Sequence, residues 1–487
     1  MVAENTLLKS ENSALKANLE AVQFQLEQLK RLVFGAKSER LESLGETHSG
    51  LLFEVNEAPA PEPIKRQITV FAPKAKPKRE GLPAHLPREI EVIDLPDTHK
   101  ACPCCGGQRH VIGEAVSEKL DYVAASVTVR QTRRPKYACR QCQGSIAVAP
   151  LPPSPIEQSM AAPGLIAHVS VAKFADHLPL NRQSAILRRD AGIEVPVSTL
   201  CDWLLGGAQA LQPLYAHLVG QLLQADILHG DDTIVPLRQK AQCAKARAWT
   251  YLSPALKLTA YEFTQSRAGA HPRSFLQQWK GGYFIADAYS GYDRLFDNPN
   301  IREVGCWSHA RRGYYEIAKV ASQRGLAHEA VERIAEFFHL EQSWTQLDAQ
   351  DRWRRRKAEL EPRLEAFREW IEAHLPRLLP KSPLAKAMGY CANHWGALTR
   401  HLEDGRLPLT NNAAERAMRP IAVGRNNWLF AGSVRGGQAA AILLSFIESA
   451  KLNQLNAFDY LRDVLTRIPS AKQRDLDALL PNQWKPA

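Results

Sequence analysis

Three acidic residues stand where their side chains could together hold divalent cations. Two short apolar runs, residues 227–230 and 283–286, lead directly to Asp231 and Asp287, and Glu415 stands early in a helix predicted to begin near residue 411. Carboxylate oxygens are the ligands that Mg²⁺ prefers in proteins. A pair of such ions can activate an attacking oxygen and stabilise the leaving oxygen when a phosphodiester is cleaved. The pattern therefore predicts a phosphoryl-transfer site in which Asp231, Asp287 and Glu415 hold two Mg²⁺ (or Mn²⁺) ions.

Each acid also has a simpler explanation. Asp and Glu usually lie on protein surfaces, and Glu415 could pair with Arg419 four residues later on the same helix. Asp232 is an alternative first ligand, because side chains alternate along a strand and only one of two neighbours can face the ions. We take Asp231 as the first ligand. The placement of all three acids in one succession of strands and helices favours a common site over separate surface charges.

The elements around these acids must bring them to one edge of a sheet. Strand-like segments cover residues 227–230, 247–252, 258–265 and 283–286, and a short helix is expected at 274–279. Three strands, a helix and a fourth strand, with acids closing the first and fourth strands, are the order of an RNase H-like fold. We therefore predict a multidomain α/β protein whose catalytic core is an RNase H-like mixed sheet.

Helical segments precede and interrupt this core. Apolar residues at helical spacing predict a helical insertion at about residues 313–405. Before the core, residues 180–189 and 198–205 form two short helical patterns with a turn at Gly192, and Ser198 is a favourable N-cap. That length fits a DNA-binding helix-turn-helix. An ordinary helical hairpin explains it equally well.

Four cysteines in two C-x-x-C pairs predict a structural zinc site. Cys102 and Cys105 form one pair, Cys139 and Cys142 form the other, and part of the segment between them alternates like strands. Four thiolates give zinc a closed tetrahedral shell, so this Zn²⁺ would be structural and not catalytic. Cys104 is a competing ligand, and free buried cysteines are the alternative for the whole set. We expect a zinc ribbon.

The N-terminal residues predict a coiled coil that would join copies of the chain. Apolar residues recur every seven positions between residues 5 and 34, with Asn12 in the same seam. One of the two repeats consists of Leu8, Leu15, Val22 and Leu29. Paired helices require this spacing, and a buried Asn fixes their register, so we expect a homo-oligomer. A single amphipathic helix docked on its own domain is the alternative.

The composition fits a soluble protein that binds a polyanion. The 487 residues include 62 Lys and Arg against 51 Asp and Glu, a formal net charge of +11. Such a basic excess suits nucleic acid, although a charge that only maintains solubility fits as well. The chain opens without an apolar leader, and no apolar run is long enough to span a membrane. We therefore expect a cytoplasmic protein that has no membrane partner.

Four stretches of the sequence resemble the insertion-sequence-sixty-six transposases of bacterial mobile elements. They read DAYSGY at 287–292, CWSHARR at 306–312, NNAAER at 411–416 and WLFAGS at 428–433. The resemblance extends over nearly the whole chain, including the zipper and the cysteine pairs. Two positions depart from it. The family has Asp-Glu-Thr where this chain has Asp-Asp-Thr at 231–233, and it has a lysine where this chain has Asn426.

The resemblance implies a DDE-type DNA transposase whose catalytic acids are Asp231, Asp287 and Glu415. Such an enzyme binds the ends of an insertion sequence, cleaves them to give 3′-OH ends and joins those ends to target DNA. It also implies accessory proteins of the same element and a location at the nucleoid. The competing functions are a DNA-binding regulator derived from an inactive transposase and a stand-alone RNase H-like nuclease. The intact acids argue against the first, and the zipper with the zinc unit argues against the second.

Several residues near these motifs are candidate DNA contacts, because arginine forks suit phosphate oxygens. Helix-surface charge explains each arginine equally well. The candidates are Arg311, Arg312, Arg416, Arg419, Arg425 and Trp428. Cys306 and His309 are interpreted as a buried thiol and a packed histidine.

The expected organisation has six parts. They are a coiled-coil segment at 1–44, a Pro- and Lys-rich linker at 45–90, a zinc-ribbon DNA-binding domain at 91–150, a helical DNA-binding region at 151–224, the RNase H-like core with its insertion at 225–440, and a C-terminal helical region at 441–487.

Overall fold

The computed structural model of the protein describes residues 127–132, 136–137, 147–148, 151–240 and 242–486. The predicted coiled coil, the linker and the four cysteines expected to bind zinc lie outside the described residues. Within the segment predicted as the zinc ribbon, β1 (Lys136–Tyr137) and β2 (Ala147–Val148) form an antiparallel pair.

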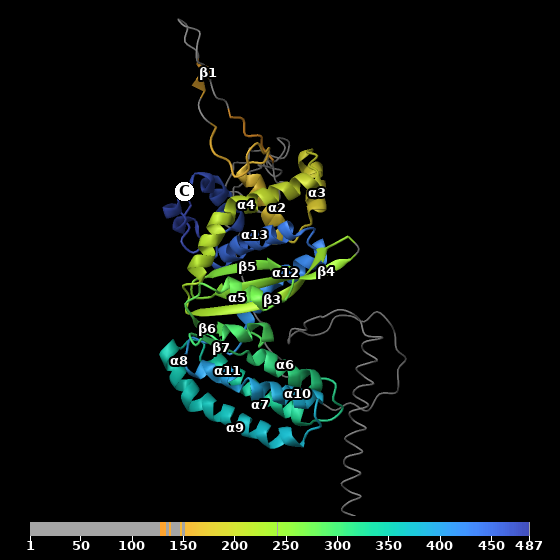
Figure 1. The fold of residues 1–487 in the computed structure, drawn as a ribbon, viewed down its shortest axis with the longest axis vertical. Coiled ribbons are helices and arrows are strands. Elements are labelled where there is room, and N and C mark those ends of the chain that lie inside the picture. The colour runs from red at the N-terminus through yellow and green to blue at the C-terminus, as the bar shows by residue number, and fades with distance from the viewer. Residues whose placement is uncertain (1–126, 133–135, 138–146, 149–150, 241, 487) are drawn as a thin grey trace, which may run out of the picture. The chain divides into compact units, whose positions relative to one another are not determined.

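A five-stranded mixed sheet forms the centre of the core (Figure 1). Its strands are β3 (Ile227–Arg238), β4 (Cys243–Ser253), β5 (Leu258–Thr264), β6 (Gly282–Ile285) and β7 (Ile301–Val304). Their spatial order is β5-β4-β3-β6-β7, in which β3, β4 and β5 pair antiparallel while β6 and β7 run parallel to β3. The sheet confirms the predicted mixed α/β architecture.

Helices precede, interrupt and follow the sheet. Before and within it lie α2 (Pro163–Phe174), α3 (Leu180–Ala191), α4 (Val197–Leu222), α5 (Ala270–Phe275) and the 3-10 helix η2 (Ser290–Leu295). After β7 come α6 (Trp307–Ala318), α7 (Leu326–Ser343), α8 (Ala349–Arg355), the π-helix η3 (Arg356–Leu360), α9 (Glu361–His374), η4 (Leu375–Arg377), α10 (Pro383–Asn393), α11 (Trp395–Thr399) and η5 (Arg400–Leu402). The C-terminal part holds α12 (Asn412–Trp428), α13 (Val434–Leu452), α14 (Ala457–Arg467), η6 (Ile468–Ser470), η7 (Gln473–Asp475) and η8 (Asp477–Leu479). Among the residues that the structure describes, no helix combines the length and the hydropathy needed to cross a membrane.

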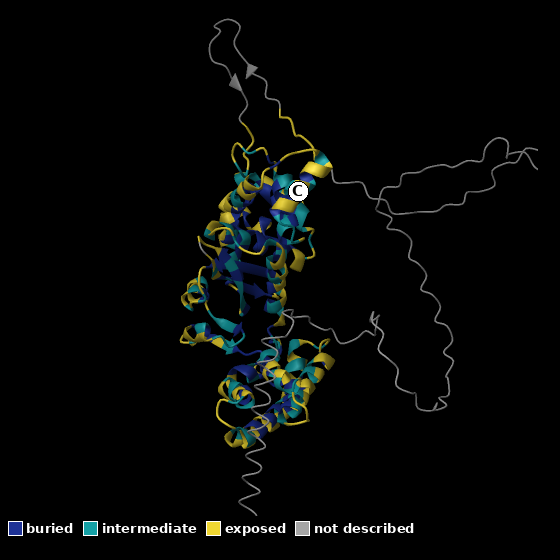
Figure 2. Ribbon diagram, turned by 90° about the vertical axis from the view of Figure 1, so that its right-hand side faces the viewer, coloured by how far each residue is buried: buried dark blue, intermediate teal, exposed yellow. Residues whose placement is uncertain are grey.

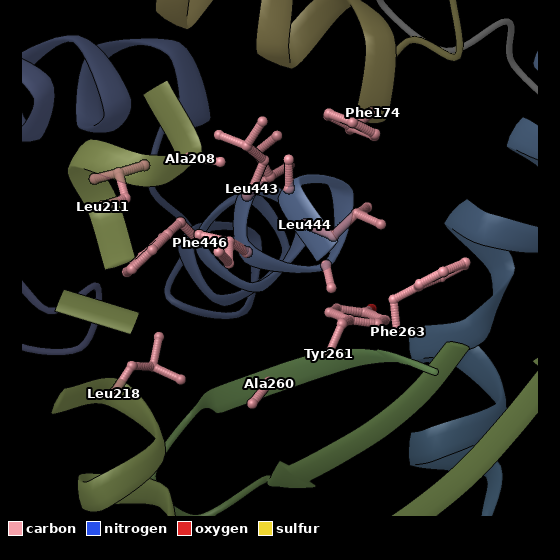
Figure 3. Packing of buried hydrophobic residues seen from close by; sticks show 14 of the residues in the cluster. Phe174, Ala208, Leu211, Leu218, Ala260, Tyr261, Phe263, Leu443, Leu444 and Phe446 are labelled. Atoms are coloured by element: carbon pink, nitrogen blue, oxygen red, sulfur yellow. The ribbon is translucent and has the colours of Figure 1, made fainter. Parts of the chain in front are cut away.

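Helix α13 is buried along most of its length and carries the main core. Figure 3 shows Leu443, Leu444 and Phe446 of this helix among side chains of α2, α4 and β5. A helix that is apolar all round must be covered on several sides, and these elements provide the cover. Each large apolar side chain buried there contributes about 1.5–3 kcal/mol to folding.

Two serines of α13 complete the hydrogen bonding of β5, which is an edge strand. Ser445 Oγ accepts from the backbone N–H of Tyr261 at 2.8 Å. Ser449 Oγ accepts from Thr259 N at 3.0 Å and donates to Thr259 O at 3.1 Å. Backbone groups at a sheet edge need such partners when they are buried. This requirement explains why a serine interrupts the apolar run at 439–447.

The helices between β7 and α12 have their own aromatic core. The ring of Trp307 lies 5.1 Å from that of Phe337 and 6.1 Å from that of Phe367, measured between centroids. Figure 2 shows this second buried zone apart from the buried residues of the sheet and its helices. The insertion therefore has enough apolar packing to fold as a layer of its own.

Arg356 is fully buried and ties this insertion to the segment that returns to α12. Its guanidinium donates to both carboxylate oxygens of Glu341, at 2.5 and 2.9 Å. It also donates to the carbonyl oxygens of His401, Asp404 and Leu407, at 2.7, 3.0 and 2.8 Å. One side chain thus satisfies three carbonyls, one in η5 and two in the irregular segment that follows it.

Four local predictions were wrong or incomplete. Strand β3 does not end at Asp231 but continues to Arg238, because its pairing with β4 extends from His229 to Arg238. Helix α4 begins at Val197 and has 26 residues, so Ser198 does not cap a short helix. The helix expected at 274–279 is α5, which begins and ends four residues earlier. Strand β7 was not predicted.

Replacing Arg356 by Met should destabilise the protein by about 3–5 kcal/mol, because Glu341 would lose its partner inside the protein. Arg355→Met is the matched control. Arg355 is exposed, and its ion pair in the described part of the chain is with Glu359 of the adjoining η3, so its loss should cost less than about 0.5 kcal/mol. Urea unfolding, followed by tryptophan fluorescence, measures the free energy of unfolding of both variants. Equal midpoints for the two variants would show that the buried arginine does not stabilise the insertion.

Candidate functional site

Strands β3 and β6 and helix α12 carry the three predicted acids. Asp231 lies within β3, Asp287 lies two residues after β6 ends, and Glu415 lies in the first turn of α12. Strand β6 runs parallel to β3, with Ile285 opposite His229. The next residues along both strands therefore reach the same edge of the sheet, which places Asp231 and Asp287 together.

Asn411 connects the start of α12 to β3 and to the start of the insertion. It is fully buried, and its Nδ2 donates to Gly230 O at 2.8 Å. Its Oδ1 lies 3.0 Å from His229 Nδ1, and its backbone N–H donates to Cys306 Sγ at 3.2 Å. Asn411 occupies the N-cap position of α12, but its side chain makes no capping bond. The side chain instead fixes the distance between Glu415 and the strand that carries Asp231.

The hydrogen-bonding roles around Asn411 follow from its amide. Because Nδ2 donates to Gly230 O, Oδ1 can only accept, so His229 must donate from Nδ1. Burial lowers the pKa of His229 to about 4, which keeps the imidazole neutral. Residue 230 must be glycine, because a Cβ there would collide with the ring of Phe284.

The three carboxylates lie close enough to influence one another's charge. Burial, supplemented by the negative charges of Asp287, Asp232 and Glu415, raises the pKa of Asp231 to about 7. Glu415 Oε1 is buried and has no hydrogen-bond partner among the described residues. Packing like charges in a buried site is unfavourable unless cations or protons neutralise them. The three carboxylates therefore offer oxygen donors from three separate segments, and oxygen is the donor that divalent cations such as Mg²⁺ prefer.

Backbone groups orient two of the acids. Asp231 Oδ1 accepts from Asp232 N at 2.8 Å, and Asp287 Oδ1 accepts from Tyr289 N at 3.2 Å. Ala288, which lies between Asp287 and Tyr289, has a left-handed φ of 60°. Such a conformation costs a non-glycine residue about 1–2 kcal/mol. The tight turn after β6 therefore holds the Asp287 carboxylate at the sheet edge.

Asp232 has different partners from Asp231. Its side chain is only 2% exposed and lies 2.9 Å from Arg247 Nη1 and 2.8 Å from Arg267 Nη2. Arg267 Nη2 is also 3.9 Å from Asp287 Oδ2. Two guanidinium groups thus occupy the Asp232 carboxylate. Neither arginine was predicted as a site residue, since each lies on a different segment and no sequence motif connects them.

Cys306 and His309 lie beside Glu415. The Cys306 sulfur, a His309 ring nitrogen and a Glu415 oxygen lie within 4.8 Å of one another, and His309 Nδ1 is 3.8 Å from Glu415 Oε1. Burial lowers the pKa of His309, and the nearby Glu415 charge partly opposes this shift. Both residues were predicted to be packing groups. Their C-x-x-H spacing at a helix start was the signal that could have linked them to the acids.

The candidate DNA contacts fall into two groups. Arg312, Arg416 and Arg419 are exposed on α6 and α12, the helices that carry His309 and Glu415. Arg311 is half-buried, and its guanidinium lies 5.4 Å from the ring centroid of Tyr315. These four arginines can present charge near the acids.

Arg425 and Trp428 have partners within the protein. Arg425 Nη1 donates to Thr233 Oγ1 at 3.2 Å and to Ile234 O at 3.0 Å. Trp428 is half-buried against the main core, with Lys173 Nζ 5.8 Å from its ring. Both side chains hold the C-terminal half of α12 against its surroundings, at the opposite end of the helix from Glu415.

Comparisons with known proteins identify related sequences along most of the chain. A family model described as "Transposase IS66 family" matches residues 158–439. A model of the zinc-finger binding domain of transposase IS66 matches residues 99–143, which include all four predicted zinc ligands. The IS66 C-terminal element matches residues 445–482, and a model described as transposase C of IS166 homeodomain matches residues 21–90.

Full-length relatives agree with these matches. The uncharacterized protein y4hP of Sinorhizobium fredii (strain NBRC 101917 / NGR234) is 33% identical, over 96% of this chain and 89% of its own length. The uncharacterized protein y4jD of the same strain is 34% identical, over 94% of this chain and 93% of its own length. The similarity therefore extends over most of the length of this chain and of both relatives, and it is not limited to one shared domain.

Asp231→Asn should make the metal-free protein more stable at high pH. The pKa of Asp231 rises from 3.8 to about 7 on folding, so folding favours its protonated form. Below about pH 4 Asp231 is protonated in both the folded and the unfolded wild-type, so its titration causes no difference in stability between the wild-type and the variant. As pH rises toward 7 the wild-type should lose stability relative to the variant, until the gap levels at about 2–4 kcal/mol.

Urea midpoints measured in EDTA at pH 5 and pH 8 test this expectation. Asp293→Asn, at an exposed acid of η2, is the matched control for loss of one carboxylate. A gap between wild-type and Asp231→Asn that is the same at both pH values would show that folding does not raise the pKa of Asp231.

Proposed function

Because this chain belongs to the IS66 family of transposases, we propose that it cleaves DNA at the ends of an insertion sequence and joins the new 3′-OH ends to target DNA. We assign the chemistry to Asp231, Asp287 and Glu415. The observation that carries this assignment is the gathering of these three carboxylates, from segments up to 184 positions apart, with enough mutual repulsion to help raise the pKa of Asp231.

The sheet supports an RNase H-like core. Three antiparallel strands are followed by two parallel ones, in the order β5-β4-β3-β6-β7, and a helical insertion separates β7 from the helix with the last acid. In this arrangement the first acid lies on the central strand, the second follows its parallel neighbour, and the third arrives on α12. The topology thus accounts for acids that are distant in sequence.

The three acids would hold two Mg²⁺ (or Mn²⁺) ions. Bound ions of this kind activate an attacking oxygen and stabilise a leaving oxygen in phosphodiester chemistry. The unpartnered Glu415 Oε1 supports this role, because a buried carboxylate oxygen needs a donor or a cation.

The protein's own contribution is to orient these groups in advance. Backbone amides hold Asp231 and Asp287 in place, and the bonds of Asn411 hold the first turn of α12 beside them. Groups placed before the substrate arrives lower the entropic part of the barrier. The exposed Arg312 and Arg416 are proposed to contact phosphates of the DNA beside the acids.

The N-terminal parts would recruit the DNA and a second copy of the chain. The zinc-ribbon segment is proposed to bind the element ends, with Zn²⁺ on Cys102, Cys105, Cys139 and Cys142. The leucine repeat at residues 5–34 is proposed to pair two copies, so that both ends are held together. Accessory proteins of the same element are further proposed partners.

Two other functions make different predictions. A regulator derived from an inactive transposase would bind element ends without cutting them, and a stand-alone nuclease would nick DNA without joining it. The retained acids favour an enzyme over a regulator. An assay that scores joined products separately from nicked products distinguishes all three.

Asp287→Asn and Glu415→Gln should each lower cleavage about a thousandfold or more, which corresponds to about 4 kcal/mol of barrier. The amides keep the shape of the side chains but remove the charge that would hold the cations. Binding of element-end DNA should persist. Single-turnover cleavage on a labelled element end, next to a mobility-shift assay, measures both properties.

Asp293→Asn and Glu316→Gln are matched controls at exposed acids near the site, and they should cleave normally. Near-normal cleavage by both Asp287→Asn and Glu415→Gln would rule out this catalytic site.

One zinc ion per chain should be found in protein purified without chelator, and Cys139→Ser should lose it. Structural zinc supplies much of the folding energy of small domains, so this variant should also become sensitive to protease in the N-terminal part. Cys104→Ser is the control and should keep the metal. Mass spectrometry measures the zinc content of the wild-type protein and of both variants. Retention of zinc by Cys139→Ser, or its loss from Cys104→Ser, would contradict the assigned ligands.

A further inference from the structure

Arg267 is a cation held beside the acidic site by a residue that is not one of the proposed ligands. It lies in the loop between β5 and α5. Its Nε donates to both carboxylate oxygens of Asp232, at 3.0 and 3.1 Å, and its Nη2 donates to Asp232 Oδ1 at 2.8 Å. This arrangement is a charge-assisted fork, which fixes the plane of the guanidinium.

Tyr289 holds the other side of the same guanidinium. The guanidinium carbon of Arg267 lies 3.7 Å from the centroid of the Tyr289 ring, and the Tyr289 hydroxyl donates to the Arg267 carbonyl. A cation stacked on an aromatic face at this distance is stabilised further. Tyr289 also donates its backbone N–H to Asp287. One residue therefore links the position of Arg267 to that of a proposed catalytic acid.

The remaining face of Arg267 is open toward the site. Its Nη2 is 3.9 Å from Asp287 Oδ2, its Nη1 has no acceptor among the described residues, and its side chain is 36% exposed. The Asp232 carboxylate that anchors it is almost completely buried. The Nη1 group of this partly exposed guanidinium thus has two N–H donors that no acceptor among the described residues uses. Those donors match the oxygens of a phosphate group.

We propose that Arg267 binds a phosphate of the DNA strand that enters the acidic site, and that Asp232 is the positioning residue that holds the guanidinium there. This inference rests on the proposed function, because it takes the strand being cut as the ligand. It also gives Asp232 a role that differs from that of its neighbour Asp231. The negative charge of Asp232 holds the guanidinium of Arg267 and not a divalent metal ion.

Arg247 provides a matched control for Arg267. It also pairs with Asp232, at 2.9 Å, but its side chain is only 19% exposed, and it makes no ion pair with Asp287 in the described part of the chain. Loss of either arginine removes one positive charge and one partner of Asp232. Only loss of Arg267 should remove a phosphate contact.

The binding test uses the full-length protein and a fluorescein-labelled duplex that carries the end of the element. Affinity is measured in EDTA over a series of KCl concentrations. Arg267→Gln should bind about tenfold more weakly, and the slope of log affinity against log salt should fall by about one. Arg247→Gln should keep the wild-type slope. Equal slopes for Arg267→Gln and the wild-type, with both proteins folded by circular dichroism, would overturn the phosphate contact.

Arg267→Lys keeps the experiment decisive if the Gln variant does not fold. Lysine keeps the charge but cannot bind Asp232 through a fork while donating elsewhere. This variant should keep the salt slope and lose cleavage about tenfold. Full cleavage by Arg267→Lys would show that a fixed guanidinium is not required.

Asp232→Asn separates positioning from simple electrostatics. The variant makes the site more positive, so charge alone predicts tighter DNA binding and undiminished cleavage. The positioning role instead predicts cleavage about tenfold lower, without weaker binding, and undiminished cleavage would overturn it. Cleavage by Asp287→Asn serves as the reference for the proposed function. If that variant cuts normally, the assigned chemistry fails, whereas the salt slope of Arg267→Gln still reports on the phosphate contact.

Discussion

The buried amide of Asn411 is the interaction on which the geometry of the site depends. About a hundred residues separate β7 from α12, so chain connectivity alone cannot place Glu415 beside β3. Asn411 places it through hydrogen bonds to Gly230, His229 and Cys306, each of about 1 kcal/mol net. Removing any partner would leave a buried polar group without a bond, which costs more than the bond contributes. The position of the third acid therefore depends on a few satisfied polar groups, together with Met418 and Ile421, by which α12 joins the main core.

Electrostatic balance is the second constraint. Asp231 and Asp287 lie at one edge of the sheet, and burial together with the charges of Asp287, Asp232 and Glu415 raises the pKa of Asp231. The protein does not cancel this repulsion with a direct partner for each acid. It places Arg267 and Arg247 on Asp232, one residue away, so that positive charge lies near the acids while Asp231 stays available.

Much of this arrangement could be predicted from the sequence, and the limits have physical causes. Strand-like runs leading to Asp231 and Asp287, and the start of the helix with Glu415, were predictable because local patterns create them. Strand β7 was missed because its four residues, Ile301–Val304, include the charged Arg302 and Glu303 and therefore form no apolar run like that of β6. The end of β3 was placed too early because pairing with β4 determines its length. The Asp232–Arg267 pair could not be predicted, since nothing in the chain connects positions 35 residues apart until β3, β4 and β5 have paired.

The helical insertion and the site belong to one connected structure. Arg356, inside the insertion, binds the carbonyl of Leu407, and two residues later the carbonyl of Leu409 accepts from Trp307, which is part of the aromatic core. Two residues beyond that, Asn411 binds β3. The segment that positions Glu415 is therefore bonded at alternate residues to the insertion and then to the sheet. A helical layer attached only by flexible linkers could not transmit its rigidity in this way. The insertion consequently acts as the rigid support that sets where α12 begins, and its own packing is a condition for the three acids to meet.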